Sequence, residues 1–388
     1  MKSDKLSMIT GRSAFLRLLC YEGVDILFGN PGTTELAIMD ALPGFPDLRY
    51  VLGLQEAIVV AMADGYSRAS GRLAACNVHV APGLGNAMGS LYNAKFFGSP
   101  VLITAGQQEQ GHGLMEPLLY DPLVPIAQSQ VKWAVEVNRL ADLPRIVRRA
   151  AKIATTPPTG PVFISLPGDI LDAEGELDLL AASRVRRDVR PSVEALEALA
   201  DRILAAQNPV LLCGHEVATR DALREVEALA EALGVPVLQQ SVPYGAHYRS
   251  EHPAFLGALT RNQQQVRSAL EPHDLLVCLG ADVLRMSVWS AIDPLPPGMT
   301  VVQISERDHE LAKNYPAEIA IRADLRESLR ALLPVLEQRM PAARRSEVSG
   351  RMAAISARNW SARRSKLAAE AAALSINGPS MPVRFVSI

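Results

Sequence analysis

Apolar residues along the chain follow two patterns, short continuous runs and longer stretches that repeat every three or four positions. In the first half, the runs VDILFG, RYVLGL, LAACNVHV, PVLITA and PVFISL predict buried strands. Helical spacing marks residues 10–22, 56–69, 86–97 and 143–154. Strands that alternate with helices in this way predict a parallel sheet covered by helices.

Turn formers divide this first half. PGLG at residues 82–85 predicts a tight turn between a strand and a helix. Residues 106–140 lack clean periodicity and predict a long loop with one short helix. We expect the first domain to span residues 1–170 and a charged linker to follow at 171–191.

The second half repeats the rhythm and predicts a central domain at residues 192–340. Helices are expected at 192–206, 221–234 and 322–339, the last kinked or interrupted by Pro334. Strands are expected at NPVLLCG, VPVLQQ, LLVCLGADV and MTVVQIS. The predicted fold class is therefore α/β, with two consecutive doubly wound parallel-sheet domains.

The last segment, residues 341–388, has a different composition. It contains eight Lys or Arg residues against two Glu and is rich in alanine. This favours a solvated helical tail over a nucleic-acid-binding arm. We expect the tail to lead toward a further domain that this chain does not include.

Composition narrows the class of protein. The 388 residues are 48% hydrophobic and carry a net charge of −2, which argues against a nucleic-acid surface. No apolar run approaches the length of a membrane span, and no secretion signal is expected. The four cysteines have no metal-binding spacing and mostly lie in apolar runs. We expect a soluble cytoplasmic protein with reduced thiols.

Glu56 is the first candidate for chemistry. It precedes an almost uncharged helical stretch, so its carboxylate is expected to face an apolar environment, where it could exchange a proton with a basic ring nitrogen. The alternative is a purely structural role, in which an acid in the first turn stabilises the helix dipole by about 0.3–1 kcal/mol.

Two further candidates lie where strands of a parallel sheet end, which is where α/β proteins assemble their sites. His79 ends the third predicted strand, and Thr33 lies in the turn after the first. Either could instead be structural, Thr33 as a helix cap. The glycines from Gly83 to Gly89 miss the dinucleotide-binding spacing by one residue, so a Rossmann dehydrogenase is a weak alternative.

Five segments, taken in order, resemble a known family. FGNPGTTEL, LQEAIVVAMADGYSRASG, NVHVAPGLGNAMGSLYNA, PVLITAGQQ and TGPVFISLPGDI resemble the pyrimidine-binding domain of the thiamine diphosphate-dependent 2-keto acid decarboxylases. Within that superfamily they most resemble the benzoylformate decarboxylases. The resemblance is strong over residues 10–170 and looser over 190–340.

The resemblance implies a cofactor site. Glu56 would hydrogen-bond the aminopyrimidine ring of thiamine diphosphate, and His79 and Thr33 would be the other catalytic residues. The remaining cofactor-binding residues would come from two turns, and they are Asn30, Pro31, Gly32, Gly83 and Asn86.

The sequence departs from the family in two places. At the family's second active-site histidine, expected within residues 283–289, the chain has Ser287. The Gly-Asp-Gly signature of the C-terminal domain, which binds Mg²⁺ and the diphosphate, does not occur. We therefore expect this chain alone to bind thiamine diphosphate weakly.

Three functions stay open. The chain could be part of a 2-keto acid decarboxylase that is incomplete alone, an acetolactate synthase-like carboligase, which His79 disfavours, or a non-catalytic interaction subunit. The resemblance implies a 2-keto acid substrate and either a homodimer or homotetramer or a separate diphosphate-binding subunit. We expect no nucleic-acid or membrane partner.

Overall fold

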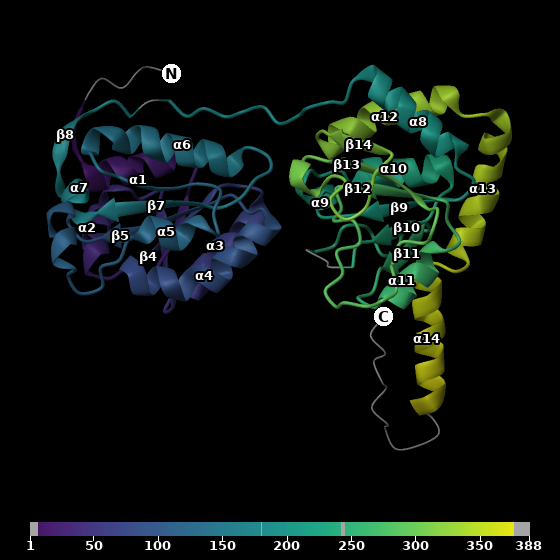
Figure 1. The fold of residues 1–388 in the computed structure, drawn as a ribbon, viewed down its shortest axis with the longest axis horizontal. Coiled ribbons are helices and arrows are strands. Elements are labelled where there is room, and N and C mark those ends of the chain that lie inside the picture. The colour runs from purple at the N-terminus through teal and green to yellow at the C-terminus, as the bar shows by residue number, and fades with distance from the viewer. Residues whose placement is uncertain (1–6, 180, 242–244, 376–388) are drawn as a thin grey trace. The chain divides into compact units, whose positions relative to one another are not determined.

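The computed structural model describes residues 7–179, 181–241 and 245–375, and the chain forms two compact units, Met1–Arg186 and Arg187–Ile388 (Figure 1). Each unit is built around one six-stranded parallel sheet with helices on both faces. The predicted fold class is confirmed. Within the described ranges, no helix is both long and apolar enough to cross a bilayer.

The sheet of the first unit has the strand order β3-β2-β4-β5-β7-β6, and all of its strand pairs are parallel. Its four interior strands are buried along their whole length, as expected for a sheet covered on both faces. The strands are β2 (Ile26–Gly29), β3 (Arg49–Leu52), β4 (Ala74–Val78), β5 (Val101–Gln107), β6 (Ala134–Glu136) and β7 (Val162–Pro167).

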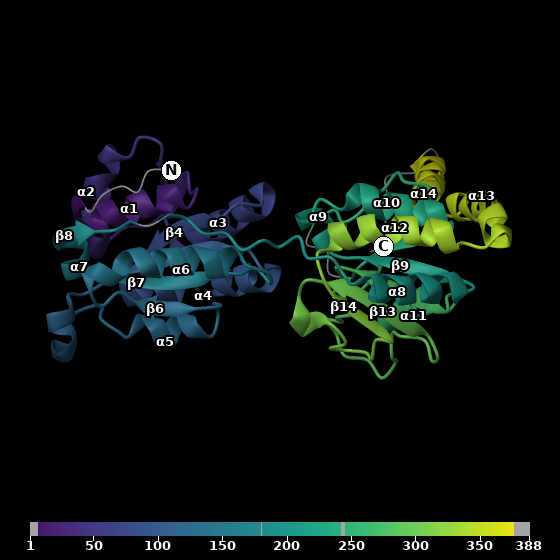
Figure 2. The same ribbon diagram turned by 90° about the horizontal axis from the view of Figure 1, so that it is seen from above.

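Two groups of helices cover this sheet. On one face α1 and α6 pack around Phe15 and Leu143, and on the other α3, α4 and α5 pack around Val59 and Leu84 (Figure 2). The helices are α1 (Gly11–Tyr21), α2 (Leu36–Ala41), α3 (Glu56–Ser70), α4 (Val80–Phe97), α5 (Leu123–Gln128), α6 (Leu143–Thr155) and α7 (Gly168–Asp172).

One predicted turn is wrong. Residues 82–85 do not form a tight turn, because α4 already begins at Val80. Pro82 is tolerated there because the backbone N–H groups of the first helical turn have no intrahelical partner.

The segment predicted as a long loop contains more structure than expected. It holds a 3₁₀ helix (Gln110–Met115), α5 and the edge strand β6. A further strand, β8 (Glu174–Leu177), lies within the segment predicted as a linker and pairs antiparallel with β1 (Ser7–Thr10). This pairing joins the two ends of the first unit.

The second unit has the strand order β11-β10-β9-β12-β13-β14, again all parallel. Helices α8, α10 and α12 cover one face of the sheet and α11 packs on the other. Its strands are β9 (Pro209–Cys213), β10 (Val237–Gln239), β11 (Phe255–Ala258), β12 (Leu275–Leu279), β13 (Thr300–Ser305) and β14 (Ile319–Arg322). Its helices are α8 (Val193–Ala205), α9 (Glu216–Thr219), α10 (Leu223–Leu233), α11 (Gln263–Leu270), α12 (Leu325–Arg339), α13 (Ala342–Ser356) and α14 (Trp360–Ser375).

The C-terminal helices differ from expectation in two ways. Pro334 lies inside α12 without dividing it into two helices. The basic residues of the predicted tail do not all face solvent, because Arg344 donates to the backbone oxygen of Ala206 and Arg351 to that of Gly234. These bonds hold α13 against the rest of the second unit.

A candidate cofactor and active site at the carboxyl edge of the first sheet

Glu56 is the first residue of α3. The helix begins there because the Gln55 side chain accepts a hydrogen bond from the backbone N–H of Ile58, and it ends at Gly71 in a left-handed conformation (φ 68°). Glu56 is only 7% exposed. The structure therefore places a buried carboxylate at the positive end of a helix.

The first turns of α4 form the wall beside this carboxylate. The Asn86 amide donates to Glu56 Oε2 over 3.1 Å. Gly83 lies against the other oxygen, and a Cβ atom added there would be 2.9 Å from Glu56 Oε1. Glycine at this position thus lets the Glu56 carboxylate pack close against the backbone of α4, which any larger residue would prevent.

His79 follows β4 and is the N-cap residue of α4. Its backbone oxygen accepts a hydrogen bond from the N–H of Gly83 over 2.8 Å, so the first turn of α4 runs from His79 to the residue that contacts Glu56. The His79 side chain is 21% exposed, and its Nδ1 lies 2.8 Å from Glu35 Oε2. His79 thus lies at one end of this helical turn, and Gly83, at the other end, contacts Glu56.

The turn after β2 supplies the other predicted residues. Asn30, Pro31 and Gly32 are half-buried, and Thr33 is exposed. The neighbouring hydroxyl is the one that reaches the site, because Thr34 Oγ1 lies 3.3 Å from His79 Nδ1.

Glu35 is the functional candidate that the sequence did not single out. Its side chain is 1% exposed and lies among polar groups from three segments of the chain. Burial raises the pKa of the nearby Tyr50 hydroxyl, and the charge of Glu35 raises it further. A local signal for such a role was absent, because an acid three residues after the N-cap residue is common at helix starts, where it accepts the N-cap N–H, as Glu35 does from Gly32.

Metal and thiol chemistry find no support in the described part of the chain. No group of three or more His, Cys, Asp or Glu residues there could hold a metal ion. Cys76, Cys213 and Cys278 are free and buried, and burial raises the pKa of each thiol. Raised thiol pKa values disfavour the reactive thiolate.

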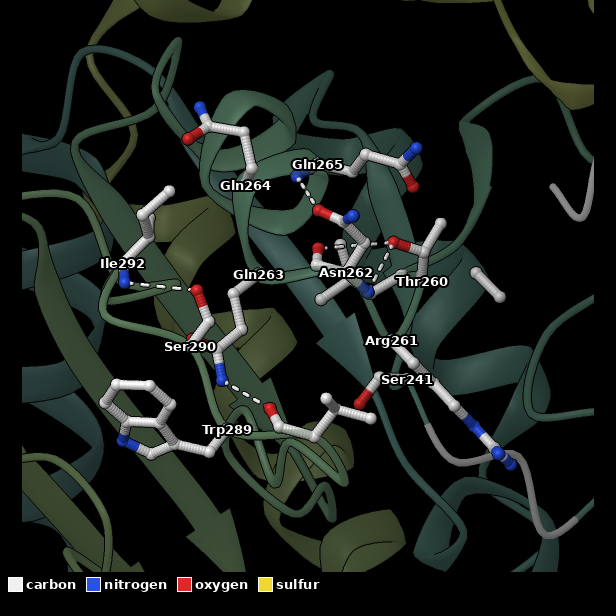
Figure 3. Close-up of a pocket in the computed structure, with 13 residues that line it drawn as sticks. Ser241, Thr260, Arg261, Asn262, Gln263, Gln264, Gln265, Trp289, Ser290 and Ile292 are labelled. Atoms are coloured by element: carbon white, nitrogen blue, oxygen red, sulfur yellow. Dashed lines mark hydrogen bonds between the residues drawn. The ribbon is translucent and has the colours of Figure 1, made fainter.

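The second unit has an open cavity of about 800 Å³ beside β11 (Figure 3). Residues 260–265 line one part of it and residues 288–290 and 292 another. The Gln263 amide joins the two parts by donating to the backbone oxygen of Val288 over 2.9 Å. Trp289, 87% exposed, lies in this lining. Ser287, at the position predicted for a second histidine, is exposed next to it.

Comparison with protein families matches both units. Residues 9–118 match the N-terminal TPP-binding domain of thiamine pyrophosphate enzymes, and residues 196–332 match their central domain. The first segment contains Glu35, Glu56 and His79.

Individual relatives point to two kinds of enzyme. The chain is 36% identical to benzoylformate decarboxylase of Pseudomonas aeruginosa, with 87% of this chain and 63% of that protein covered. It is 28% identical to acetolactate synthase of Mycobacterium bovis, covering 85% of this chain and 54% of that protein. The chain thus spans less than two thirds of the length of these relatives.

Two solved structures of decarboxylases are also similar to the chain. The thiamine diphosphate-dependent 4-hydroxybenzoylformate decarboxylase of Rhodococcus jostii superimposes with a TM-score of 0.79 at 32% identity, covering 86% of this chain and 63% of that one. Benzoylformate decarboxylase from Polynucleobacter necessarius also gives 0.79, at 35% identity, covering 85% and 61%.

Proposed function

Because the chain belongs to the thiamine pyrophosphate enzymes through its N-terminal and central domains, we propose that it functions in the thiamine diphosphate-dependent decarboxylation of a 2-keto acid. The observation that carries the proposal is the buried carboxylate of Glu56, which packs against Gly83 and accepts a hydrogen bond from Asn86. The 36% identity to a benzoylformate decarboxylase supports decarboxylation as the reaction.

The residues around Glu56 fit the cofactor's ring. The Glu56 carboxylate lies against Gly83, and it can hold a proton between itself and a nitrogen of a bound heterocycle. We expect Asn86 to keep the carboxylate in place, and Asn30, Pro31 and Gly32 to lie along the cofactor. When bound, thiamine diphosphate supplies the electron sink for loss of carbon dioxide.

His79 and the threonines would act on the substrate. His79 can accept or donate a proton at the ring nitrogen that does not face Glu35. Thr33 remains a proposed hydroxyl of the site, and Thr34 joins it because its contact with His79 is direct. Benzoylformate is the first substrate to test, since two of the related structures carry that name or a hydroxylated form of it.

The diphosphate and its Mg²⁺ require further ligands, which we expect from another subunit or domain. Apolar side chains next to Glu56 support an interface there, because Leu54 is 85% and Ile58 53% exposed. Exposed apolar surface beside a site is typical of contact with a partner. We therefore propose at least a dimer in the active assembly.

The test is an activity assay on the full chain. The chain would be mixed with thiamine diphosphate, Mg²⁺ and the remaining C-terminal part of the Pseudomonas relative, and carbon dioxide release from benzoylformate and other 2-keto acids would be measured. Release that requires this chain supports the proposal. If no mixture gives release although cofactor binds, decarboxylation is not its reaction.

A carboligase is the second candidate, because acetolactate synthases are 28% identical to the chain. The same mixture supplied with pyruvate separates the two functions. Acetolactate without net accumulation of the aldehyde indicates the carboligase, whereas an aldehyde product indicates the decarboxylase. A folded chain that gives neither product from pyruvate and no carbon dioxide from benzoylformate or the other 2-keto acids is a non-catalytic interaction subunit.

Gly83→Ala is expected to lower activity without lowering stability. Alanine is favoured over glycine in a helix by about 1 kcal/mol, so α4 should not be destabilised. The new Cβ would lie 2.9 Å from Glu56 Oε1 and displace the carboxylate. We expect the melting temperature to be kept or raised and decarboxylation to fall by roughly tenfold or more.

Gly89→Ala is the matched control for this variant. Gly89 lies in the same helix, and a Cβ there would meet nothing within 4 Å. It should give the same gain in stability without loss of activity. Equal activity in the two variants would show that the contact between Gly83 and Glu56 is irrelevant to the reaction.

A further inference from the structure

The buried carboxylate of Glu35 has no counterpart among the predicted site residues. It ends the 3₁₀ turn Thr33–Glu35 that follows β2, and it is 1% exposed. A capping role alone would satisfy one oxygen through the N–H of Gly32, over 2.8 Å. The other contacts need a different explanation.

Two further donors occupy the second oxygen of Glu35. Oε1 accepts the backbone N–H of Gly106 over 2.7 Å and the hydroxyl of Thr34 over 2.9 Å. Gly106 lies on β5, two strands away from the turn. Both oxygens of Glu35 therefore already accept hydrogen bonds, and a carboxylate has no hydrogen of its own to donate.

This environment determines which nitrogen of His79 carries a hydrogen. Nδ1 lies 2.8 Å from Glu35 Oε2 and 3.3 Å from Thr34 Oγ1. The carboxylate can only accept, and the Thr34 hydroxyl already donates its hydrogen to Glu35. Nδ1 therefore has to be the donor.

Gly32 holds the same ring from another side. A Cβ atom on Gly32 would lie 2.3 Å from both Cε1 and Nδ1 of His79, so the imidazole lies directly against the glycine backbone. Glu35 binds the N–H of this same glycine. One carboxylate thus orders both the ring and the backbone on which the ring rests.

We propose that Glu35 is a positioning residue that holds His79 in the Nδ1–H tautomer and leaves Nε2 as the nitrogen that exchanges a proton in the site. The inference rests on the proposed function for the use of Nε2. The tautomer itself depends only on Glu35 and can be measured without any reaction.

The test uses the full chain labelled with ¹⁵N-histidine and long-range ¹H–¹⁵N spectra, which distinguish the two neutral tautomers. Two buried histidines provide internal references. The ring of His273 is expected as Nδ1–H, because Nδ1 lies 3.0 Å from the backbone oxygen of Asn208. The ring of His252 is expected as Nε2–H, because its Nδ1 accepts the N–H of Ala254 over 3.1 Å.

The His79 signals are assigned as those that are lost in His79→Gln. In the native chain we expect these signals to show the same Nδ1–H pattern as those of His273. An Nε2–H pattern for His79 in the native chain would overturn the proposal, whatever the variants do. In Glu35→Gln the amide offers a donor where Nδ1 needs an acceptor, so the His79 pattern should change to that of His252.

Because His252 and His273 both lie in the second unit, a native-like thermal transition of the first unit is needed to show that Glu35→Gln is folded. If the variant does not fold, Glu35→Asp keeps a carboxylate and is expected to retain the Nδ1–H pattern with a weaker preference. In the assembled enzyme we expect Glu35→Gln to lower turnover by about tenfold or more. A correct tautomer in a chain without decarboxylation would refute the proposed function but leave the role of Glu35 intact.

Discussion

Replacing Glu56 with glutamine is expected to lower decarboxylation by at least about a hundredfold, because a positioned proton-transfer group contributes roughly 10²–10⁴ in rate. Glutamine has nearly the same shape and still offers an oxygen to the Asn86 amide, which donates to Glu56 in the native chain. The loss should therefore appear in turnover of the assembled enzyme, measured as carbon dioxide release, while the melting temperature changes little.

Asp64→Asn is the matched control. Asp64 lies on the same helix and is as buried as Glu56, each being 7% exposed. Its carboxylate accepts a hydrogen bond from Ser99, and burial raises the pKa of the Asp64 carboxyl. Because Asp64 bonds to Ser99 and not to a candidate site residue, its replacement should leave activity within about twofold of the native value.

The two variants together give a clear outcome. If Glu56→Gln keeps native activity, Glu56 has no proton-transfer role and the proposed site is wrong. If Asp64→Asn loses as much activity as Glu56→Gln, the loss reflects removal of any buried charge from α3 rather than cofactor chemistry.

Hydrophobic spacing was sufficient to predict most of the fold. The buried strands β4, β5 and β7 have nearly continuous apolar sequences, and the helices α1, α3 and α6 have clear periodicity. Short edge strands were missed, including β6, β11 and β14, because they are half-exposed and have only three or four residues. Such segments take their conformation from a neighbouring strand rather than from their own sequence.

The turn predicted at residues 82–85 was wrong for an instructive reason. Proline and glycine are the usual turn formers, but proline also fits the first turn of a helix. Gly83 is explained by its contact with Glu56, which lies 27 positions earlier and on a different helix. Local sequence contains no record of that contact.

The contacts of Glu35 likewise could not be predicted from the residues near it in the sequence. The pattern Gly32 to Glu35 predicts a helix cap, and the structure does contain that capping bond. What makes Glu35 a candidate positioning residue is the N–H of Gly106, 71 positions away in the sequence, and the ring of His79, 44 positions away. Only the order of strands in the folded sheet brings these groups together.

The second unit contains a buried charge cluster that sequence periodicity also did not reveal. Glu216, Asp282 and Arg307 follow β9, β12 and β13, and they are 0%, 4% and 6% exposed. Arg307 donates to the Asp282 carboxylate, and its Nε lies 3.6 Å from Glu216 Oε1. Glu216 also accepts the Ser305 hydroxyl over 2.5 Å and the N–H of Glu306 over 3.1 Å.

This cluster lies where the strand order of the second sheet reverses, between β9 and β12. Open α/β sheets commonly bind ligands at that crevice. Here the chain fills it with its own charged side chains, and Gly280 takes a left-handed conformation (φ 56°) against Glu216. The cluster therefore joins three strand ends, and its integrity should matter for stability.

Arg307→Met is expected to lower the free energy of unfolding of the second unit by about 3–5 kcal/mol, because it removes the buried guanidinium that pairs with both Asp282 and Glu216. Urea unfolding of the full chain, followed by probes specific to each unit, would measure the loss. Arg339→Met is the matched control. Arg339 pairs with Asp201 on the surface of the same unit, through hydrogen bonds of 2.7 and 2.6 Å, and its loss should change stability little.

The pH dependence distinguishes a charge effect from simple loss of packing. Burial raises the pKa of the Glu216 carboxyl, and the Arg307 charge partly opposes that rise. A carboxyl with a higher pKa in the folded than in the unfolded chain makes folding less favourable as the pH rises through that range. Without Arg307 the rise is larger, so the stability difference between the variant and the native chain should be large at neutral pH and shrink toward about pH 5. A loss of the same size at every pH would mean that Arg307 acts through packing of its side chain and not through its charge.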